Sequence, residues 1–463
     1  MRQNALGLVL IGLALLGKPA AGDEPAPQFP PPAPPKDESA LGLGVQRTMH
    51  LLASSTPEHR NPVRILFYGQ SITEQDWSKQ VAADLKARFP HADLEIENRA
   101  IGGFASQLLI RPAEHDLYPF YPDLLIFHVY GANGEYEQII KATRGRTTAE
   151  VLMQKDHVTQ WPPEVIDEKK DKGMWWDNLM NHHILPDIAS KYGCGLVDIR
   201  GPWLDYLRTN HFEPKDLLKD GVHLNDRGNS LMAALVSRYL VHRPDLPDTP
   251  WRGLVRTFEV GDDLKWEGGK LTLDFQGNRV DALPAPRSDG KGPPLKVLID
   301  GKAPSEAGDL SRITRPQPGP WSPLTVTRVD RDQPLVAEDW TLKVTSVSDD
   351  SQSWTFKVSG SKTGPDGGGS NGETFVSKSG RVKIEPAAWF RVGKVPVGYE
   401  ITWHAVPMYV DTYAPPKLDD PTREHATTLA QGLTNDKHRL ELVAEGRDAA
   451  PIRAIRVYRP PVK

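Results

Sequence analysis

The chain has 463 residues, too many for one ordinary domain, so its length predicts two or three domains. Hydrophobic residues make up 38% and charged residues 25%, as is usual for a soluble globular protein. The formal net charge of -4 gives no reason to expect a nucleic-acid partner. The single cysteine, Cys194, excludes an intrachain disulfide and a cysteine-rich zinc site.

The N-terminus has the pattern of a secretory signal peptide over residues 1–22. Arg2 gives it a positive start, residues 5–16 form an apolar run, and small residues at 20–22 offer a cleavage region. The run is shorter than the roughly 20 residues of a membrane-spanning helix, so an uncleaved anchor is the weaker interpretation. We expect an exported protein, secreted or periplasmic, without stable membrane insertion. Residues 23–40, dominated at first by proline and alanine, predict an extended tether.

Residues 41–245 alternate strand-like and helix-like runs. The strand-like runs lie at 64–69, 93–98, 123–129 and 195–199, and helical spacing occurs at 77–89, 176–192 and 230–241. This alternation predicts an α/β domain with a parallel sheet and helices on both of its faces. The polar interval 141–173 interrupts the rhythm, and it is either a lid over the site or a surface insertion.

Residues 251–463 have a different character, with little helical periodicity. Short alternating or β-branched runs, separated by Gly, Pro and Asp, predict an all-β sandwich. These runs lie at 270–275, 296–299, 324–327, 341–347, 353–358, 399–410, 438–443 and 455–458. The glycine-rich segment 362–372 is predicted to be a mobile loop tip. The domain either binds carbohydrate or serves as a packing domain, and we favour packing.

Four short polar blocks follow strands or precede a helix in the α/β region. Ser71 stands between the strand 64–69 and a helix, a glycine pair ends at Gly103, Asn133 follows a buried strand, and Asp220 and His223 precede the last helix. Each has a structural alternative: a helix cap for Ser71 or Asp220, a turn for Asn133, a surface hydrogen bond for His223. Loops after parallel strands share one edge of the sheet, so the set together predicts one site.

The residue types of this site suit nucleophilic catalysis. Serine needs a neighbouring base to take its proton, which His223 can do, and Asp220 can fix the tautomer of the imidazole and stabilise its cation. A tetrahedral oxyanion needs fixed donors, and the N–H groups of Ser71 and Gly103 with the Asn133 amide can supply them. We expect Ser71, Asp220 and His223 to be catalytic, and no metal or other cofactor to be required.

These blocks resemble those of the SGNH, or GDSL-like, hydrolase superfamily. The matching segments are Gly69-Gln70-Ser71, Gly103, Gly131-Ala132-Asn133 and Asp220-Gly221-Val222-His223, and the resemblance covers residues 64–242. It implies a flavodoxin-like α/β/α sandwich and favours Gly103 over Gly102, the alternative in the glycine pair, as oxyanion donor. Two positions depart from the family pattern, because Gln70 and Gly134 replace aspartates. Neither is one of the four residues that name the family, but both could alter loop rigidity or substrate preference.

The leading hypothesis is an exported esterase that removes acetyl or other short acyl groups from a carbohydrate. Trp161, Trp175 and Trp176 are candidate sugar contacts. Acyl transfer to a sugar hydroxyl, lipase or thioesterase activity, and non-catalytic carbohydrate binding are the alternatives. The acid pairs at 349–350 and 419–420 could bind calcium but are more typical of solvated turns. Neither the oligomeric state nor the acyl group follows from the sequence.

Overall fold

The computed structural model describes residues 29–246, 253–286, 288–316, 321–444 and 452–462. The predicted signal peptide and the beginning of the predicted tether lie outside these residues. Residues 29–38, which belong to the tether, contain neither helix nor strand. Within the described ranges, none of the helices combines the length and the apolar character that crossing a membrane requires.

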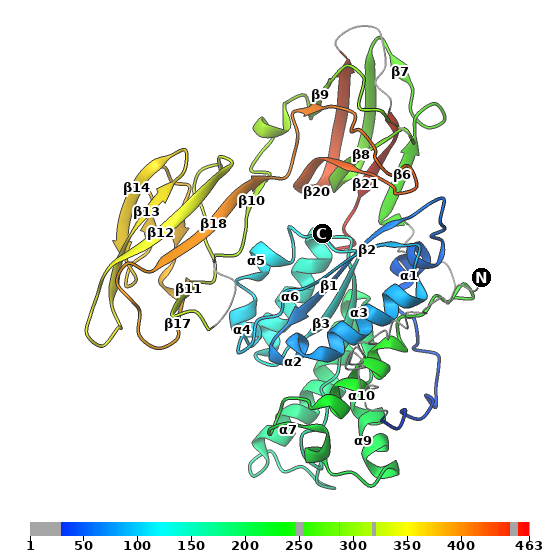
Figure 1. Cartoon of the computed structure of the whole chain (residues 1–463), viewed down its shortest axis with the longest axis vertical. Coiled ribbons are helices and arrows are strands. Elements are labelled where there is room, and N and C mark those ends of the chain that lie inside the picture. Colours follow the sequence, from blue (N-terminus) through cyan, green and yellow to red (C-terminus); the bar gives the residue numbers. More distant parts are fainter. Residues whose placement is uncertain (1–28, 247–252, 287, 317–320, 445–451, 463) are drawn as a thin grey trace, which may run out of the picture. The chain divides into compact units, whose positions relative to one another are not determined.

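A five-stranded parallel sheet forms the centre of the α/β region (Figure 1). Its strand order is β2-β1-β3-β4-β5, the order of flavodoxin-like folds, so the predicted fold is confirmed. The first strand, β1, pairs in parallel with β2 on one side and with β3 on the other. The bounds are β1 (Pro62–Gly69), β2 (Asp93–Asn98), β3 (Leu124–His128), β4 (Glu150–Gln154) and β5 (Gly195–Val197).

Helices cover both faces of this sheet. Alternate residues of β1 enter different cores: Ile65 and Phe67 belong to one hydrophobic cluster, and Leu66 and Tyr68 to the other. The first cluster takes side chains from α1 (Gln46–Ala53), α3 (Asp76–Arg88), α9 (Arg200–Thr209) and α10 (Asp226–Ser237). The second takes them from α4 (Ser106–Leu109), α5 (Ala113–Asp116), α6 (Asn133–Arg146) and α8 (Leu185–Tyr192), and α7 (Lys172–Leu179) leads through a π-helical turn into α8.

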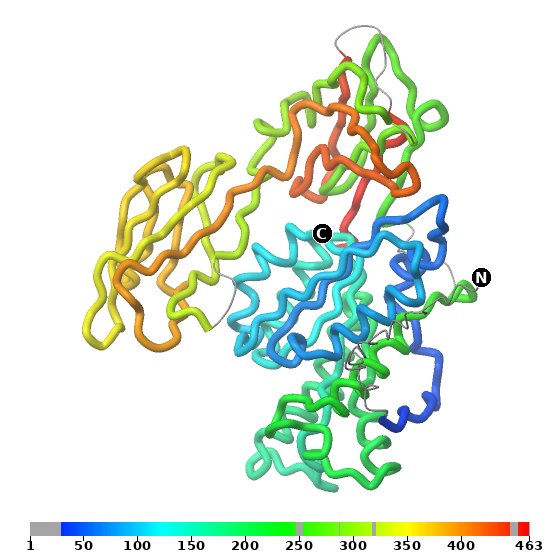
Figure 2. Tube along the Cα trace, viewed as in Figure 1, coloured from blue at the N-terminus to red at the C-terminus, as the bar shows by residue number. Residues whose placement is uncertain are grey.

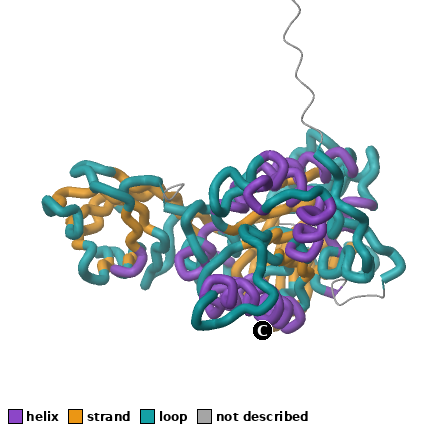
Figure 3. The backbone as a smooth tube through the Cα atoms, turned by 90° about the horizontal axis from the view of Figure 1, so that it is seen from below, coloured by secondary structure: helices purple, strands orange, loops and turns teal. Residues whose placement is uncertain are grey.

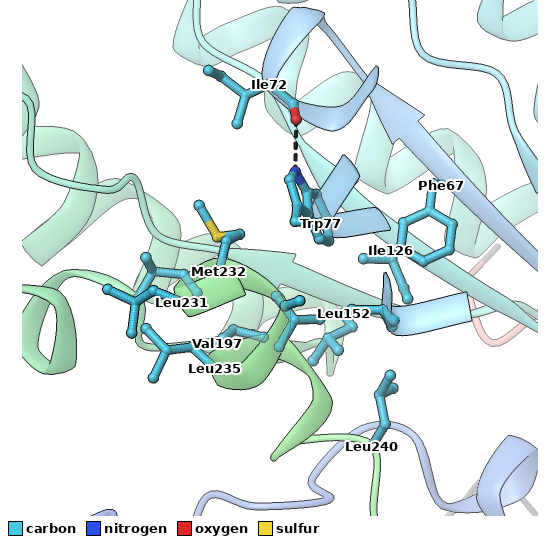
Figure 4. Close-up of a cluster of buried hydrophobic side chains, with 14 of the residues drawn as sticks. Phe67, Ile72, Trp77, Ile126, Leu152, Val197, Leu231, Met232, Leu235 and Leu240 are labelled. Carbon is cyan, nitrogen blue, oxygen red and sulfur yellow. Dashed lines mark hydrogen bonds between the residues drawn. The ribbon is translucent and has the colours of Figure 1, made fainter. Parts of the chain in front are cut away.

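Trp77 anchors α3 in the first of these two clusters. Its side chain is fully buried, and its indole Nε1 donates a 2.6 Å hydrogen bond to the Ile72 carbonyl oxygen (Figure 4). The ring also meets Phe67 edge to face. A buried indole N–H usually finds such a partner, and the bond fixes α3 to the segment that carries Ser71.

The interval 141–173 is not one insertion, which corrects the sequence analysis. It holds the end of α6 and the whole of β4, so only the loop 155–171 remains. The polar residues Glu150 and Gln154 at the ends of β4 hide the strand in the sequence, yet both are buried. The Glu150 carboxylate accepts hydrogen bonds of 2.8 Å from the N–H groups of Arg47 and Thr48, in the first turn of α1. Such pairing lets a polar residue be buried.

The all-β prediction for the C-terminal region is confirmed, and the region is organised around two separate hydrophobic clusters. A seven-stranded sheet contains β6 (Val255–Glu259), β7 (Trp266–Glu267), β8 (Lys270–Pro284), β9 (Leu295–Ile299), β19 (Thr412–Tyr413), β20 (Thr427–Ala444) and β21 (Ile452–Tyr458). A five-stranded sheet contains β10 (Ser311–Ile313), β12 (Glu338–Val347), β13 (Trp354–Gly360), β14 (Gly364–Ser370) and β18 (Glu400–Pro407).

The smaller sheet belongs to a stretch of chain that interrupts the larger one. Two short pairs accompany it, β11 (Leu324–Val326) with β17 (Trp389–Arg391) and β15 (Phe375–Val376) with β16 (Lys383–Ile384). Figure 2 shows this interrupting stretch mainly in yellow, and it shows the segments of the larger sheet that precede and follow it in the sequence in green and in orange to red. In Figure 3 the helices, in purple, gather mainly around the strands of the α/β region.

The glycine-rich segment 362–372 is mostly a strand, so the predicted mobile loop tip is wrong. β14 pairs antiparallel with β13, with Ser370 opposite Thr355 and Gly364 opposite Gly360. A Cβ added to Gly368 would lie 2.4 Å from the Phe356 carbonyl oxygen. Glycine is thus required here for close approach of the backbones and not for a turn.

Candidate active site

Ser71 lies at the point where β1 ends and the short helix α2 (Ser71–Glu74) begins. Gln70 is extended and occupies the N-cap position, so Ser71 is not the cap of this helix. A Cβ at Gly69 would lie 1.9 Å from the His128 carbonyl oxygen, at the end of the neighbouring strand. Glycine at 69 therefore lets the end of β1 approach β3 closely, and the residues that follow it lie beyond the edge of the sheet.

Ser71, His223 and Asp220 form a continuous chain of hydrogen bonds. The Ser71 Oγ lies 3.0 Å from the His223 Nε2, and the His223 Nδ1 lies 2.8 Å from the Asp220 Oδ2. Both distances fall within the range for a nucleophile, its base and the group that orients the base. The His223 and Asp220 side chains are 34% and 51% exposed, so the site is open to solvent.

The second carboxylate oxygen of Asp220 is also occupied. It accepts hydrogen bonds from the N–H groups of His223, at 2.7 Å, and Val222, at 2.8 Å. These N–H groups, with the bond from the imidazole, lower the pKa of Asp220 to about 2. Asp220 is therefore ionised at neutral pH and can stabilise a positive charge on His223. The cap of α10 is Asn225, whose Oδ1 accepts from the Gly228 N–H at 3.0 Å, so Asp220 is not that cap.

Gln75 connects the nucleophile segment with the histidine loop, and the sequence analysis did not identify it. Its Nε2 donates to the Leu224 carbonyl oxygen at 3.0 Å, and its Oε1 accepts from the Leu224 N–H at 3.0 Å. Both backbone groups of the residue after His223 are thus held by one side chain four positions after Ser71. No local pattern signals this role, because the partners are 149 residues apart.

The predicted oxyanion donors lie at the same edge of the sheet. Gly103 is in the loop after β2 with a φ of +79°, and no acceptor for its N–H occurs among the described residues. The Gly102 N–H, in contrast, donates to the Glu74 Oε1 at 2.7 Å. This commitment of Gly102 supports the choice of Gly103 as the donor.

Asn133 is the first residue of α6, directly after the loop that follows β3. Its Oδ1 is buried without a hydrogen-bond partner in the described chain, which leaves the Nδ2 as the group that can serve a ligand. The loops after the three strands are tied together, because the Ile101 N–H donates to the Gly69 carbonyl at 2.9 Å and the Ser106 Oγ to the Ala132 carbonyl at 2.8 Å. Among the described residues, no hydrogen bond joins Gly103 or Asn133 directly to Ser71, and their roles stay predictions.

A cavity of about 580 Å³ adjoins Ser71 and His223. Most of the residues that line it are polar or charged, among them Glu74, Lys219 and Asn229. Trp321 also lines it and is 78% exposed, whereas the predicted sugar contacts Trp161, Trp175 and Trp176 do not line it. Trp321 lies far from the catalytic blocks in the sequence, so only its exposure in the fold could reveal it.

The residues considered for calcium are occupied in local turns. The Asp350 Oδ1 accepts from the Ser348 Oγ and the Gln352 N–H, and the Asp420 Oδ1 accepts from the Thr422 N–H and Oγ1. Across the described residues, no three His, Cys, Asp or Glu side chains gather as metal ligands would.

The departure from the family pattern at Gly134 lies at an exposed position, where an added Cβ would meet nothing within 4 Å.

Comparison with solved structures finds esterases of low identity. A two-domain esterase (CEX) active on acetylated mannans, co-crystallised with mannopentaose, is 15% identical over 91% of this chain and 97% of its own, with a TM-score of 0.35. Axe2, an acetylxylan esterase from Geobacillus stearothermophilus, is 17% identical over 41% and 98%, with a TM-score of 0.34. A GDSL-like lipase from Parabacteroides merdae is 18% identical over 40% and 99%, with a TM-score of 0.33.

No protein-family model matches the sequence, and neither does any curated protein. The solved structures are esterases and a GDSL-like lipase, the class of protein that the four sequence blocks resemble. At these TM-scores the likeness by itself assigns no substrate, and the chemistry has to be argued from the geometry of the site.

Proposed function

We propose that the protein is a serine esterase that hydrolyses short acyl esters, acetyl esters in particular. The observation that carries this proposal is the chain of hydrogen bonds from the Ser71 Oγ through His223 to the Asp220 carboxylate. Such an arrangement makes a serine hydroxyl nucleophilic, because the imidazole can accept its proton while the carboxylate stabilises the imidazolium. A serine without a neighbouring base would remain a poor nucleophile.

The reaction would run in two halves. The Ser71 Oγ attacks the acyl carbonyl carbon as its proton passes to the His223 Nε2, and the oxyanion is bound by the N–H groups of Ser71 and Gly103 and the Asn133 amide. The tetrahedral intermediate collapses, His223 returns the proton to the departing alkoxide, and the acyl group stays on Ser71. Water then attacks the acyl-enzyme as His223 takes a proton from it. The second tetrahedral intermediate releases the acid as His223 returns that proton to the Ser71 Oγ.

We propose that the ester is carried by a carbohydrate. The cavity beside Ser71 offers charged and amide side chains for sugar hydroxyls, and the exposed indole of Trp321 offers a flat apolar surface for a sugar ring. A long acyl chain would be better served by an apolar groove. The open surroundings of Ser71, with their polar side chains, favour water over a sugar hydroxyl as the acceptor of the acyl group, because transfer to a sugar requires water to be kept out.

Export belongs to the same proposal. The predicted signal peptide, residues 1–22, would place the enzyme where acylated polysaccharides occur outside the cytoplasm. Mass spectrometry of the protein recovered from its native host should find a mature N-terminus close to residue 23. Recovery of the intact N-terminus in the cytoplasmic fraction would contradict export but would leave the esterase proposal standing.

The test compares release of p-nitrophenol from p-nitrophenyl acetate and octanoate by the purified protein and two variants. Ser71→Ala and His223→Ala should each lose at least about 10³-fold in kcat without a change in Tm. The control is His183→Ala, since His183 is exposed and makes none of the site contacts. Activity on acetate in the wild type that both variants lose supports the proposal, and screening of acetylated polysaccharides follows.

Two outcomes would contradict parts of the proposal. Faster turnover of octanoate would indicate a lipase or thioesterase. No Ser71-dependent turnover of either ester would reject the esterase, and acyl transfer to sugar acceptors and plain glycan binding would then be measured.

A further inference from the structure

His157 is a buried side chain that contacts the backbone of the catalytic loop. It follows β4 by three residues, and only 2% of it is exposed. Its Nε2 lies 2.9 Å from the carbonyl oxygen of Val222, the residue before His223. The contact joins segments 65 positions apart in the sequence. The proposed reaction makes no direct use of His157, so the contact needs another explanation.

The direction of this hydrogen bond follows from the acceptor. A carbonyl oxygen only accepts, so the His157 Nε2 must carry the hydrogen. Burial, the largest influence, lowers the pKa of His157 to about 4, so the ring is neutral at neutral pH and its Nδ1 is an acceptor. The Tyr130 hydroxyl lies 3.4 Å from this Nδ1 and keeps its own proton, because burial raises the pKa of Tyr130. The ring also packs beside Trp203, with centroids 5.4 Å apart.

The peptide unit between Val222 and His223 is consequently held at both of its polar groups. His157 donates to the Val222 carbonyl oxygen, and the backbone N–H of His223 donates to the Asp220 Oδ1 at 2.7 Å. Hydrogen bonds in such a chain polarise one another, so a donor at the carbonyl strengthens the N–H as a donor to the carboxylate. Because this peptide carries the Cα of His223, its orientation decides where the imidazole points.

The segment that bears His157 is itself fixed by buried polar contacts. The neighbouring Asp156 N–H donates to the Asn181 Oδ1 at 2.7 Å, and the Asn181 Nδ2 donates to the Asp156 Oδ2 at 2.9 Å. The other oxygen, Asp156 Oδ1, lies 3.1 Å from the His128 Nε2 at the end of β3. Asp156, Asn181 and His128 are at most 3% exposed. His157 therefore acts from a rigid base, whereas the loop that it contacts is largely exposed.

We propose that His157 is a positioning residue that holds the Val222–His223 peptide, and through it the catalytic imidazole, by a hydrogen bond from its Nε2. The role rests on the proposed function, because it matters to catalysis only if His223 is the base. It gives the loop 155–157 a function that neither a lid nor a surface insertion would supply. The loss of one such bond lets His223 depart from the line between Ser71 and Asp220, and small displacements of a reacting group are costly.

The decisive comparison uses two amide side chains of different reach. In His157→Gln the amide nitrogen can take the place of the Nε2 and still donate to the Val222 carbonyl, whereas in His157→Asn it lies near the position of the Nδ1 and cannot. We expect kcat for p-nitrophenyl acetate to fall about tenfold or more in His157→Asn with little change in KM, and to stay within about threefold of wild type in His157→Gln. His157→Phe, which keeps a ring without a donor, should resemble His157→Asn, and His183→Gln serves as the control.

A second measurement does not depend on ester turnover. Amide hydrogen exchange in a peptide covering residues 219–225 should be faster in His157→Asn than in His157→Gln or wild type. Equal kcat and equal exchange in the Asn and Gln variants would overturn the positioning role, and so would equal loss of kcat in both. If the wild type shows no Ser71-dependent turnover while exchange still responds to the substitutions, the proposed function has failed and the structural contact has not.

Discussion

Asn133 combines a structural position at the start of α6 with a proposed role as a side-chain oxyanion donor. Its backbone begins α6, its Oδ1 is buried without a partner, and its Nδ2 is the donor proposed for the oxyanion. Serine and glycine N–H groups are fixed by the backbone, but this side-chain donor can be removed without changing the path of the chain. The next residue, Gly134, departs from the family pattern; it is exposed, and a Cβ added to it would have no neighbour within 4 Å.

Substitution of Asn133 by alanine should therefore reduce kcat and leave the fold intact. Loss of one oxyanion donor typically costs about 10²–10³-fold in turnover, and we expect a decrease in this range for p-nitrophenyl acetate with KM almost unchanged. Gly134→Ala is the matched control, because it alters the next position without removing a donor. Equal kcat in wild type and Asn133→Ala would exclude Asn133 from the oxyanion site.

At the scale of elements, the site depends on the junction between α2 and α3. Gln75 occupies this junction and binds both backbone groups of Leu224. Ser71, the proposed nucleophile, begins α2, and His223, the proposed base, comes from the loop before α10, so this one side chain helps to fix their separation. The backbone N–H of Trp77, two positions later, donates to the Asn229 Oδ1 of α10 at 3.1 Å and reinforces the same connection.

Gln75→Ala should weaken this connection in two measurable ways. Two hydrogen bonds disappear and the Leu224 N–H loses its partner, whereas the Leu224 carbonyl keeps the Asn229 amide at 3.4 Å. Tm should therefore fall, and the free energy of unfolding should decrease by about 1–3 kcal/mol. The kcat should decrease by more than tenfold, because the Ser71–His223 distance is no longer held. Gln138→Ala, at an exposed position of α6, is the control. Loss of stability with unchanged kcat would mean that Gln75 only supports the fold.

At the scale of the whole molecule, two buried histidines make stability dependent on pH. Burial, with nearby arginines, lowers the pKa of His115 to about 3, and burial lowers that of His157 to about 4. The Nε2 of His115 accepts from the Val329 N–H at 3.2 Å, a bond that a protonated ring could not accept. Both groups are neutral in the folded chain and ionise near pH 6.5 when it unfolds.

Each histidine has a lower pKa in the folded chain than in the unfolded chain, where the pKa is 6.5. The stability that depends on its neutral form is therefore fully present above pH 6.5 and is lost as the pH falls toward the folded pKa. At pH 5 each histidine should cost on the order of 2 kcal/mol of the free energy of unfolding relative to pH 8. Denaturant unfolding followed by tryptophan fluorescence at both pH values would measure this. The double variant His115→Gln/His157→Gln should show a weaker decrease between pH 8 and pH 5, and an unchanged decrease would refute the assignment.

The sequence by itself determined the class of the fold and the residues Ser71, His223 and Asp220 that the structure joins by hydrogen bonds. Strand and helix periodicities are local, and the rule that loops after parallel strands share an edge places Ser71 and its partners together without knowledge of any contact. The tertiary structure decided what depends on pairing between distant residues. β4 is a strand because Glu150 is satisfied by α1, and β14 is a strand because glycine lets its backbone approach β13. Gln75 and His157 reach the catalytic loop over 149 and 65 positions, and a hydrogen bond over such a separation leaves no local pattern.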